Sequence, residues 1–191
     1  MNLPALEIET ARLRLRPFTL ADLPALIEMR ADPEVARYLT ITPSPPEQVE
    51  RDLHAAMARW RERGYDRWAV DDKETGAFMG WCGLQQKPDH VDLGYAVARA
   101  YWGRGFTTEA ARAAIRHGFE ELKFETITAI ALPENVGSWR VMEKLGMKFR
   151  QRVPYQEFPA VVFYTIERTD FRPDGSLYIF HARHENRSAE S

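Results

Sequence analysis

The chain has 191 residues, of which 45% are apolar and 12% aromatic, so it can bury one sizeable core and needs only one domain. Its formal net charge of −2 argues against a general binder of polyanions such as nucleic acids. The single cysteine, Cys82, excludes an internal disulfide, and no apolar run approaches the roughly 18 residues of a membrane span. We therefore expect a cytoplasmic protein that has neither a nucleic acid nor a membrane as its partner.

The first half of the chain predicts one strand, two helices and then three more strands. Leu13 and Leu15 alternate with arginines, which is the period of a half-buried strand. Segments that resemble helix starts, at 19–22 and 44–47, predict helices over residues 20–31 and 45–63. Apolar segments at 65–70, 77–84 and 90–97, separated by turn signals, predict an antiparallel meander. Four arginines of the second helix are expected to form a solvated face: Arg51, Arg59, Arg61 and Arg63.

The second half of the chain predicts helices that alternate with strands. Small and apolar residues recur at helical spacing over residues 107–122, so one face of this helix should pack on a sheet. A strand at 126–131, a helix at 135–145 that ends at Gly146, and strands near 147–153 and 160–167 complete an α/β arrangement with a mixed sheet.

We take residues 1–167 as one domain and residues 168–191 as a C-terminal extension that is expected to be partly disordered. Within the extension, the apolar residues from Leu177 to Phe180 predict either an edge strand or a short packed tail. The polar end from His184 is expected to be mobile.

The most informative segment is a glycine-rich elbow, residues 101–108, which runs straight into the predicted helix at 107–122. Gly103 and Gly105 allow a tight turn and a close approach of the backbone to a ligand. The free N–H groups of the first helical turn would then face an anion such as a phosphate. The elbow lacks the Lys-Ser/Thr of a P-loop and the third glycine of a dinucleotide fingerprint, so a different cofactor is indicated.

Three segments, taken in order, resemble a known family. They are Asp92-Leu93-Gly94-Tyr95 with the elbow that follows, Pro133-Glu134-Asn135-Val136-Gly137-Ser138, and Glu143-Lys144-Leu145-Gly146-Met147. Over residues 8–167 the chain resembles the GNAT acetyltransferase superfamily, most closely its RimJ/RimL-like branch, which acetylates protein N-termini. The resemblance implies a mixed, mainly antiparallel central sheet flanked by helices, in which strands at 91–97 and 126–131 splay apart to form an acetyl-CoA cleft.

The same resemblance implies acetyl-CoA as the acetyl donor. Its pyrophosphate would rest on the backbone amides of the elbow, and its pantetheine arm would run between the splayed strands and accept a hydrogen bond from, or donate one to, Asn135. A backbone N–H near Val97 would stabilise the oxyanion. No metal is implied. The implied cofactor-binding residues are Val97, Ala98, Gly103, Arg104, Gly105, Phe106, Thr107, Thr108 and Asn135.

Acetyl transfer also needs a group that takes a proton from the amine and a group that protonates the leaving thiolate. Met142 stands where many superfamily members carry a tyrosine acid and cannot donate a proton, so the resemblance points to Ser138 as the acid. Asp92 is the first candidate for the base, directly or through a water, and His90 is the second. Structural alternatives stay open. Asp92 could orient the substrate or anchor a turn, and the role of Asn135 or Ser138 could be limited to supporting the helix start.

The acceptor is the least determined feature of the sequence. A protein or peptide N-terminus is the leading acceptor, and a small amine such as an amino acid, a polyamine or an antibiotic is the closest alternative. A third alternative is a CoA-responsive module that has lost its chemistry, which Met142 and the atypical elbow residues suggest. The helices within 20–63 and the short segment 154–159 would select the acceptor, and a homodimer is left open as the assembly. Three aromatic residues are either core residues or walls of the acceptor pocket: Trp68, Trp81 and Tyr95.

Overall fold

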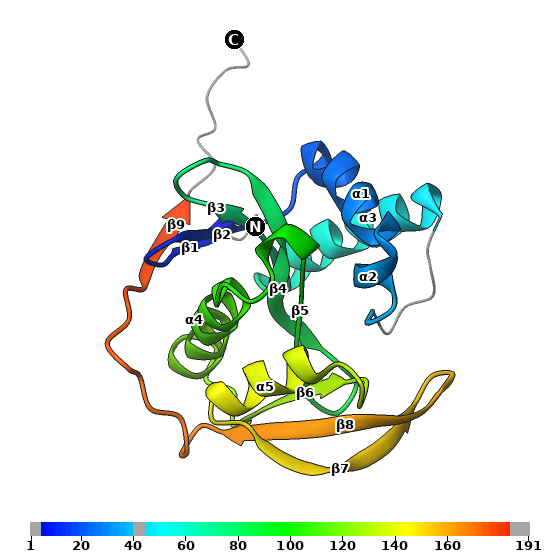
Figure 1. The fold of residues 1–191 in the computed structure, drawn as a ribbon. Helices are drawn as coiled ribbons and strands as arrows, with labels where there is room; N and C mark the ends of the chain where they lie inside the picture. The colour runs from blue at the N-terminus through cyan, green and yellow to red at the C-terminus, as the bar shows by residue number, and fades with distance from the viewer. Residues whose placement is uncertain (1–4, 40–44, 184–191) are drawn as a thin grey trace.

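The computed structural model describes residues 5–39 and 45–183, so Ser44 of the expected second helix start and the end from His184 lie outside the described residues. The strands are β1 (Ala5–Glu9), β2 (Leu13–Arg16), β3 (Arg67–Asp72), β4 (Phe78–Gln86), β5 (Val91–Val97), β6 (Thr126–Ala131), β7 (Lys148–Tyr155), β8 (Phe158–Glu167) and β9 (Ile179–Arg183). They form one sheet in the order β7-β8-β6-β5-β4-β3-β2-β1-β9 (Figure 1). Neighbouring strands are antiparallel except β5 and β6, which are parallel.

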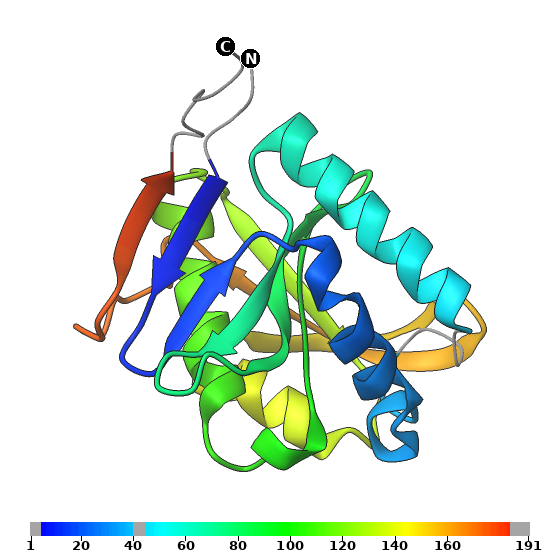
Figure 2. The ribbon, with the colours of Figure 1, turned by 90° about the horizontal axis from the view of Figure 1, so that it is seen from above.

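Helices cover both faces of this sheet, as Figure 2 shows. One face carries η1 (Leu20–Asp22), α1 (Leu23–Ala31), α2 (Pro33–Ala36) and α3 (Pro46–Arg63). The other face carries α4 (Phe106–Glu120) and α5 (Val136–Lys144). The short η2 (Arg99–Tyr101) follows β5. Leu26 of α1 and Leu53 of α3 belong to one buried cluster with Trp81 of β4, and Ile115 of α4 belongs to another with Leu84 of β4. The sheet is therefore the middle of three layers. No helix in the described ranges is long and apolar enough to cross a bilayer.

Local sequence signals set the ends of the long helices. Pro46 stands at the first position of α3, and Gly64 ends this helix with a left-handed φ of 77°. Asn135 caps the start of α5, and Gly146, with a φ of 81°, follows its end. The expected helices over 20–31, 45–63, 107–122 and 135–145 therefore match the structure to within two residues, with η1 opening the first of them.

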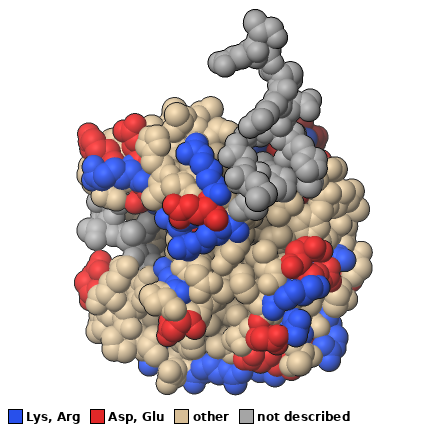
Figure 3. All heavy atoms as spheres, turned by 180° about the vertical axis from the view of Figure 1, so that it is seen from behind, with Lys and Arg blue, Asp and Glu red and all other residues tan. Residues whose placement is uncertain are grey.

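The predicted fold class is confirmed, and so is the antiparallel meander, which is formed by β3, β4 and β5. The strand β1 and the short helix α2 were not predicted. In the C-terminal extension, the edge-strand alternative is the one observed, because β9 pairs with β1 along its whole length. The expected solvated arginine face is wrong at Arg59, whose Nε lies 2.5 Å from the carboxylate of the buried Asp66. On the face shown in Figure 3, acidic and basic side chains lie side by side.

The strands β5 and β6 are joined over a very short distance. Their register has one pair of partners, Asp92 and Thr128, whereas β4 and β5 stay paired from Gly80 opposite Val97 to Gln86 opposite Val91. Beyond Asp92, the two parallel strands therefore diverge and leave one side of β5 facing a gap. Because both strands run the same way, the turns that lead into α4 and α5 begin at this same end of the sheet.

Candidate active site

The elbow after β5 has the backbone conformation that its glycines predict. Gly103 and Gly105 have φ angles of 72° and 81°, in the left-handed region that other residues enter only with strain. The first hydrogen bond of α4 runs from the N–H of Glu109 to the carbonyl of Gly105 at 3.1 Å. The N–H groups of residues 106–108 precede this bond and have no acceptor within the helix, so together they form a site for an anion.

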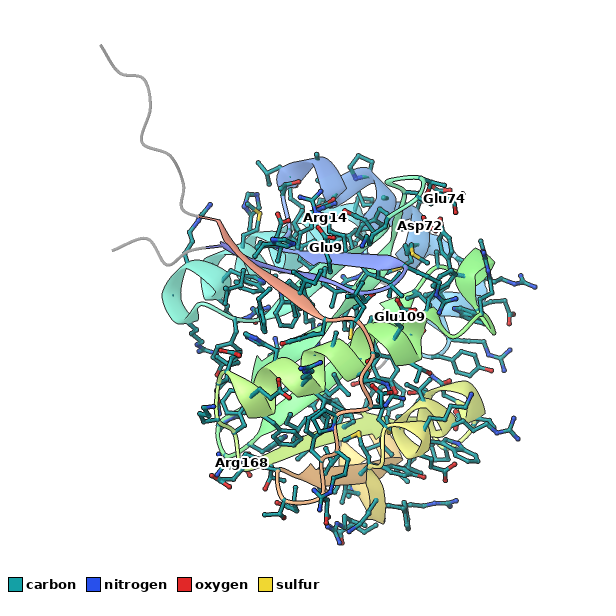
Figure 4. The ribbon with its side chains drawn as sticks, turned by 90° about the vertical axis from the view of Figure 1, so that its left-hand side faces the viewer. Glu9, Arg14, Asp72, Glu74, Glu109 and Arg168 are labelled. Atoms are coloured by element: carbon teal, nitrogen blue, oxygen red, sulfur yellow. The ribbon has the colours of Figure 1, made fainter. Side chains whose placement is uncertain are left out.

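A hydrogen-bonded clamp holds the elbow in place. This clamp was not predicted from the sequence. The carboxylate of Glu109 accepts hydrogen bonds from Thr10 Oγ1 at 2.6 Å, from the N–H of Arg12 at 2.8 Å and from Arg12 Nε at 2.7 Å. The Nη1 of Arg12 also donates to the carbonyl of Arg104 at 3.1 Å. Figure 4 shows Glu109 on α4, beneath strands β1 and β2. The clamp therefore ties the turn between these strands to the start of α4.

A cavity of about 570 Å³, here called the elbow groove, extends from this anion site to the start of α5. Among the predicted cofactor-binding residues, those that line it are Val97, Gly103, Gly105, Thr107, Thr108 and Asn135. Three predicted residues do not line it. Phe106 is buried in the core, the guanidinium of Arg104 lies 4.8 Å from the centre of the Phe106 ring, and the N–H of Ala98 donates to the carbonyl of Met79 at 2.8 Å.

The backbone of Val97 faces the gap beside β5. Val97 lies opposite Gly80, and the next residue, Ala98, makes the hydrogen bond to β4. In an antiparallel pair, residues that direct their N–H and C=O at the partner strand alternate with residues that direct them away. Val97 therefore directs both groups away from β4, and its carbonyl accepts a hydrogen bond from Trp102 Nε1 at 2.8 Å. The N–H expected near Val97 is thus that of Val97 itself.

Tyr95 and Ser138 form a hydroxyl pair across the gap. The phenol of Tyr95 donates to the carbonyl of Ser138 at 3.0 Å, and the two hydroxyl oxygens are 3.1 Å apart. Either hydroxyl can be the donor in the second contact. Burial raises the pKa of Tyr95, so the phenol stays protonated. Asn135 Oδ1 accepts from the N–H of Ser138 at 3.1 Å, so its oxygen serves as the helix cap, and its amide nitrogen is the donor that remains. Met142 is buried.

Asp92 lies where β5 and β6 are paired, and its side chain is 8% exposed. Thr128 Oγ1 is 3.0 Å from Asp92 Oδ1 and 3.1 Å from the carbonyl of Val91. Burial raises the pKa of Asp92 above its usual range, which makes it a stronger base than an exposed aspartate. His90, the second candidate, belongs to an exposed turn, where its Nδ1 lies 2.6 Å from the carboxylate of Asp89. The geometry therefore favours Asp92.

A second cavity, of about 300 Å³, lies between the sheet and helices α1 and α3, and we call it the helix-side cavity. Asp92 lines it, together with Trp81 and with Tyr155, the last residue of β7. Five residues line both cavities, so the two adjoin there: Tyr38, Leu39, Tyr95, Asn135 and Ser138. Of the three aromatic residues left open by the sequence, Trp81 and Tyr95 are therefore cavity walls, whereas Trp68 is a fully buried core residue. Four cationic side chains also line the helix-side cavity: Arg30, Arg59, Arg67 and Lys87.

Known proteins share both the sequence pattern and the fold. Residues 12–148 match the family described as the acetyltransferase (GNAT) domain. An uncharacterised N-acetyltransferase, p20 of Bacillus licheniformis, is 33% identical over 143 residues, which make up 73% of this chain and 80% of that protein. The structure of a GNAT-family acetyltransferase from Bacillus anthracis has a TM-score of 0.76 at 25% identity and covers 85% of this chain and 99% of that chain.

Two further structures show the same fold at lower identity. The ribosomal-protein-S5-alanine acetyltransferase from Vibrio fischeri has a TM-score of 0.72 at 18% identity and covers 87% of this chain and 99% of its own. The spermidine N-acetyltransferase from Vibrio cholerae, solved in complex with CoA and spermine, has a TM-score of 0.69 at 17% identity and covers 83% of this chain and 96% of its own. These two proteins differ in acceptor, so the fold by itself does not fix the acceptor.

Proposed function

The chain belongs to the GNAT acetyltransferase family, and we propose that it transfers the acetyl group of acetyl-CoA to the amino terminus of a peptide or protein. The GNAT fold uses acetyl-CoA as its co-substrate, and enzymes of this family are acyltransferases. The observation that carries the proposal is that the elbow groove and the helix-side cavity share five lining residues, among them Tyr95, Asn135 and Ser138. A thioester entering from one side and an amine entering from the other would come together there, which is the arrangement that a transfer without a covalent enzyme intermediate requires.

The elbow groove fits acetyl-CoA in its chemistry. The three N–H groups at the start of α4 suit a pyrophosphate, and Arg140 and Lys144 add positive charge to the same groove. Val97, Val136 and Val141 supply apolar lining suited to the pantetheine arm. A volume of about 570 Å³ lies within the usual range for cofactor sites.

We assign the chemical steps to three groups of this chain. The N–H of Val97 would stabilise the negative charge that develops on the thioester oxygen as the amine nitrogen bonds to the acetyl carbon. Asp92 would take the proton that the amine loses, directly or through a water. Ser138 Oγ would give a proton to the thiolate as the carbon–sulfur bond breaks and would recover a proton from solvent, and the phenol of Tyr95 would hold that hydroxyl in place.

The helix-side cavity supports a peptide over a polyamine as the acceptor. It extends along α1 and α3 to Tyr155 and Gln156, well beyond the space that an amino group needs. The turn between β7 and β8 is short, because Tyr155 pairs with Phe158. Arg67 and Lys87 of the cavity, for which no salt bridge is found among the described residues, would repel a second positive charge on a polyamine or an aminoglycoside. Contacts to several peptide residues would supply the binding energy that positions the amine.

A thiol-release assay with acetyl-CoA tests the proposal. We expect a tetrapeptide with a small residue at its free N-terminus to give a higher kcat/KM than the same free amino acid, spermidine, or a blocked peptide with an internal lysine. A preference for a small amine over every peptide would replace the peptide acceptor. CoA binding without turnover of any amine would favour the alternative of a regulatory module.

A further inference from the structure

One cation of the helix-side cavity is brought into the middle of the sheet by two glycines. Arg67 is the first residue of β3, and it lies opposite Gly83, which in turn lies opposite Gly94 of β5. A Cβ atom on Gly94 would lie 3.3 Å from Arg67 Nη2 and 3.4 Å from its Nε. The guanidinium therefore extends across β4 and lies over Gly94. Asp92 is two residues away on the same face of β5.

The guanidinium of Arg67 is poorly satisfied in this position. Its central carbon lies 4.2 Å from the centre of the Trp81 ring, and its Nη2 makes one long hydrogen bond, of 3.5 Å, to Gln85 Oε1. Its buried Nε has no hydrogen-bond partner among the residues that the structure describes. Desolvation by burial lowers the pKa of Arg67. A buried cation without a hydrogen-bonded carboxylate is costly, so this group is positioned for an anion that the chain itself does not provide.

The neighbouring cations fall into two kinds. Arg30 is paired with Asp52 at 2.7 Å and Arg59 with Asp66 at 2.5 Å. Lys87, like Arg67, donates to the neutral oxygen Gln85 Oε1, at 2.9 Å, and within the described ranges neither of these two cations makes a salt bridge. Two cations thus converge on one amide oxygen. Two carboxylates, Asp66 and Asp92, act on Arg67 through their charge, but Asp66 is paired with Arg59 and Asp92 is hydrogen-bonded to Thr128.

We propose that the acceptor amine carries a carboxylate group, and that Arg67, assisted by Lys87, binds this carboxylate while the amine lies toward Asp92 and Ser138. The planar guanidinium can bind both oxygens of a carboxylate, whereas an ammonium acts as a point charge. The carboxylate has two sources of the same chemistry: the α-carboxylate of a free amino acid, or an acidic side chain near the start of a peptide. The inference rests on the proposed function, because it concerns the acceptor of that reaction.

The test compares acceptors in pairs, one with a carboxylate and one with the corresponding amide. In the thiol-release assay, C-terminally amidated tetrapeptides Glu-Ala-Ala-Ala, Ala-Glu-Ala-Ala and Ala-Ala-Glu-Ala are paired with their Gln counterparts, and free alanine is paired with alaninamide. We expect an acid to exceed its neutral partner in kcat/KM by about 10- to 100-fold in at least one pair. The pair that responds identifies the source of the carboxylate. Equal values in every pair overturn the inference but leave the acetyltransferase proposal intact.

Variants of Arg67 locate the effect. Arg67→Gln should remove most of the preference for the acid while the Kd for CoA stays unchanged, and Arg67→Lys should keep part of the preference. Arg61→Gln, an exposed arginine of α3, is the matched control and should keep the whole preference. A loss of activity by Arg67→Gln that is equal for acid and neutral acceptors would mean that Arg67 is only structural.

A binding measurement covers the case in which no acceptor is acetylated. The melting temperature of the wild-type protein is then compared in the presence of CoA with N-acetylated Ala-Glu-Ala-Ala amide or its Gln counterpart. A larger shift with the acid, lost in Arg67→Gln, supports the carboxylate site even though the proposed reaction has failed. Equal shifts with the two peptides overturn the carboxylate site.

Discussion

The hydroxyl pair of Tyr95 and Ser138 leads to the first prediction. The phenol of Tyr95 donates to the carbonyl of Ser138, and its oxygen lies 3.1 Å from Ser138 Oγ, so the two hydroxyls are hydrogen-bonded. We expect Ser138→Ala to lower kcat by about 100-fold, because an acid acts when the thiolate leaves, and to change the Kd for CoA little. Tyr95→Phe should give a smaller loss of kcat, since the serine hydroxyl is present but less well oriented. The measurements are steady-state thiol release and calorimetric titration with CoA.

The control variant for this prediction changes an exposed serine. Ser176→Ala removes a hydroxyl from an exposed segment, where it donates to Asp174, and should leave kcat unchanged. If Ser138→Ala weakens CoA binding as much as it lowers kcat, the serine is a binding or structural residue. The acid would then have to be sought elsewhere, because Met142 cannot serve.

At the residue scale, local pattern predicted candidates but not their partners. Roles for Asp92, Asn135 and Ser138 were implied by the resemblance of their segments to the GNAT family, which does not say what surrounds each side chain. Arg67 was not predicted, because its reach toward β5 depends on two glycines in two other strands. Tyr95 was assigned to the core or to a pocket wall, because its hydrogen bond to Ser138 joins residues 43 positions apart.

At the scale of elements, the conformation of the elbow leads to the second prediction. Gly105 has a φ of 81°, and a Cβ atom there would meet only Arg12 Nη2, at 3.6 Å, so a side chain is opposed by backbone strain more than by space. We expect Gly105→Val to raise the Kd for CoA at least tenfold, because the N–H groups at the start of α4 would turn away from the phosphates. The shift in melting temperature that acetyl-CoA causes should shrink in the same variant.

A matched glycine separates this effect from a general loss of stability. Gly76 has a φ of 71° with open space around it, and it lies in the turn between β3 and β4, outside the lining of both cavities. Gly76→Val should therefore be strained to a similar degree and still bind CoA like the wild-type protein. ATP should stabilise the wild-type protein much less than acetyl-CoA does. A folded Gly105→Val variant with unchanged CoA affinity would show that the phosphates are held elsewhere.

The elements themselves were predictable where periodicity, caps and turns agree. The helix α4 and the strand β6 follow from the local pattern, because the small residues of α4 recur at helical spacing and β6 is a short apolar run. The strand β1 was not found, since Glu7 and Glu9 interrupt its apolar pattern and Glu7 is buried beside Arg14 on the next strand. The clamp from Arg12 to Glu109 spans 97 residues, so it follows from the topology and not from either local segment.

At the scale of the whole molecule, His117 of α4 contacts two strands that lie far apart in the sequence, β3 and β9. It lies on the buried face of α4, and its ring centre is 5.3 Å from that of Trp68 in β3 and 5.1 Å from that of Phe180 in β9. Its side chain is 0% exposed, and neither ring nitrogen has a hydrogen-bond partner among the described residues. Burial lowers the pKa of His117 to about 4, because the charged ring would be desolvated.

This lowered pKa predicts how stability depends on pH. The unfolded chain binds a proton at the ordinary histidine pKa of about 6.5, whereas the folded protein binds it only near pH 4, so the free energy of unfolding falls as the pH falls between these values. The loss from this one residue should be at most about 3 kcal/mol. Chemical denaturation of the wild-type protein and of His117→Phe at several pH values measures it.

The difference in the free energy of unfolding between the wild-type protein and His117→Phe gives the contribution of the histidine. The carboxylates cancel in this difference, because they titrate in both proteins. His117→Phe should flatten the curve between about pH 6.5 and pH 4, and His117→Leu should do the same if the larger ring does not fit. His54→Gln, an exposed histidine of α3, should leave the curve of the wild-type protein unchanged. Parallel curves for the wild-type protein and both His117 variants would mean that the ring is protonated in the folded state. The contact between α4 and β9 would then have to open or admit a counterion, and the C-terminal strand would be a less firmly held part of the sheet than its pairing with β1 indicates.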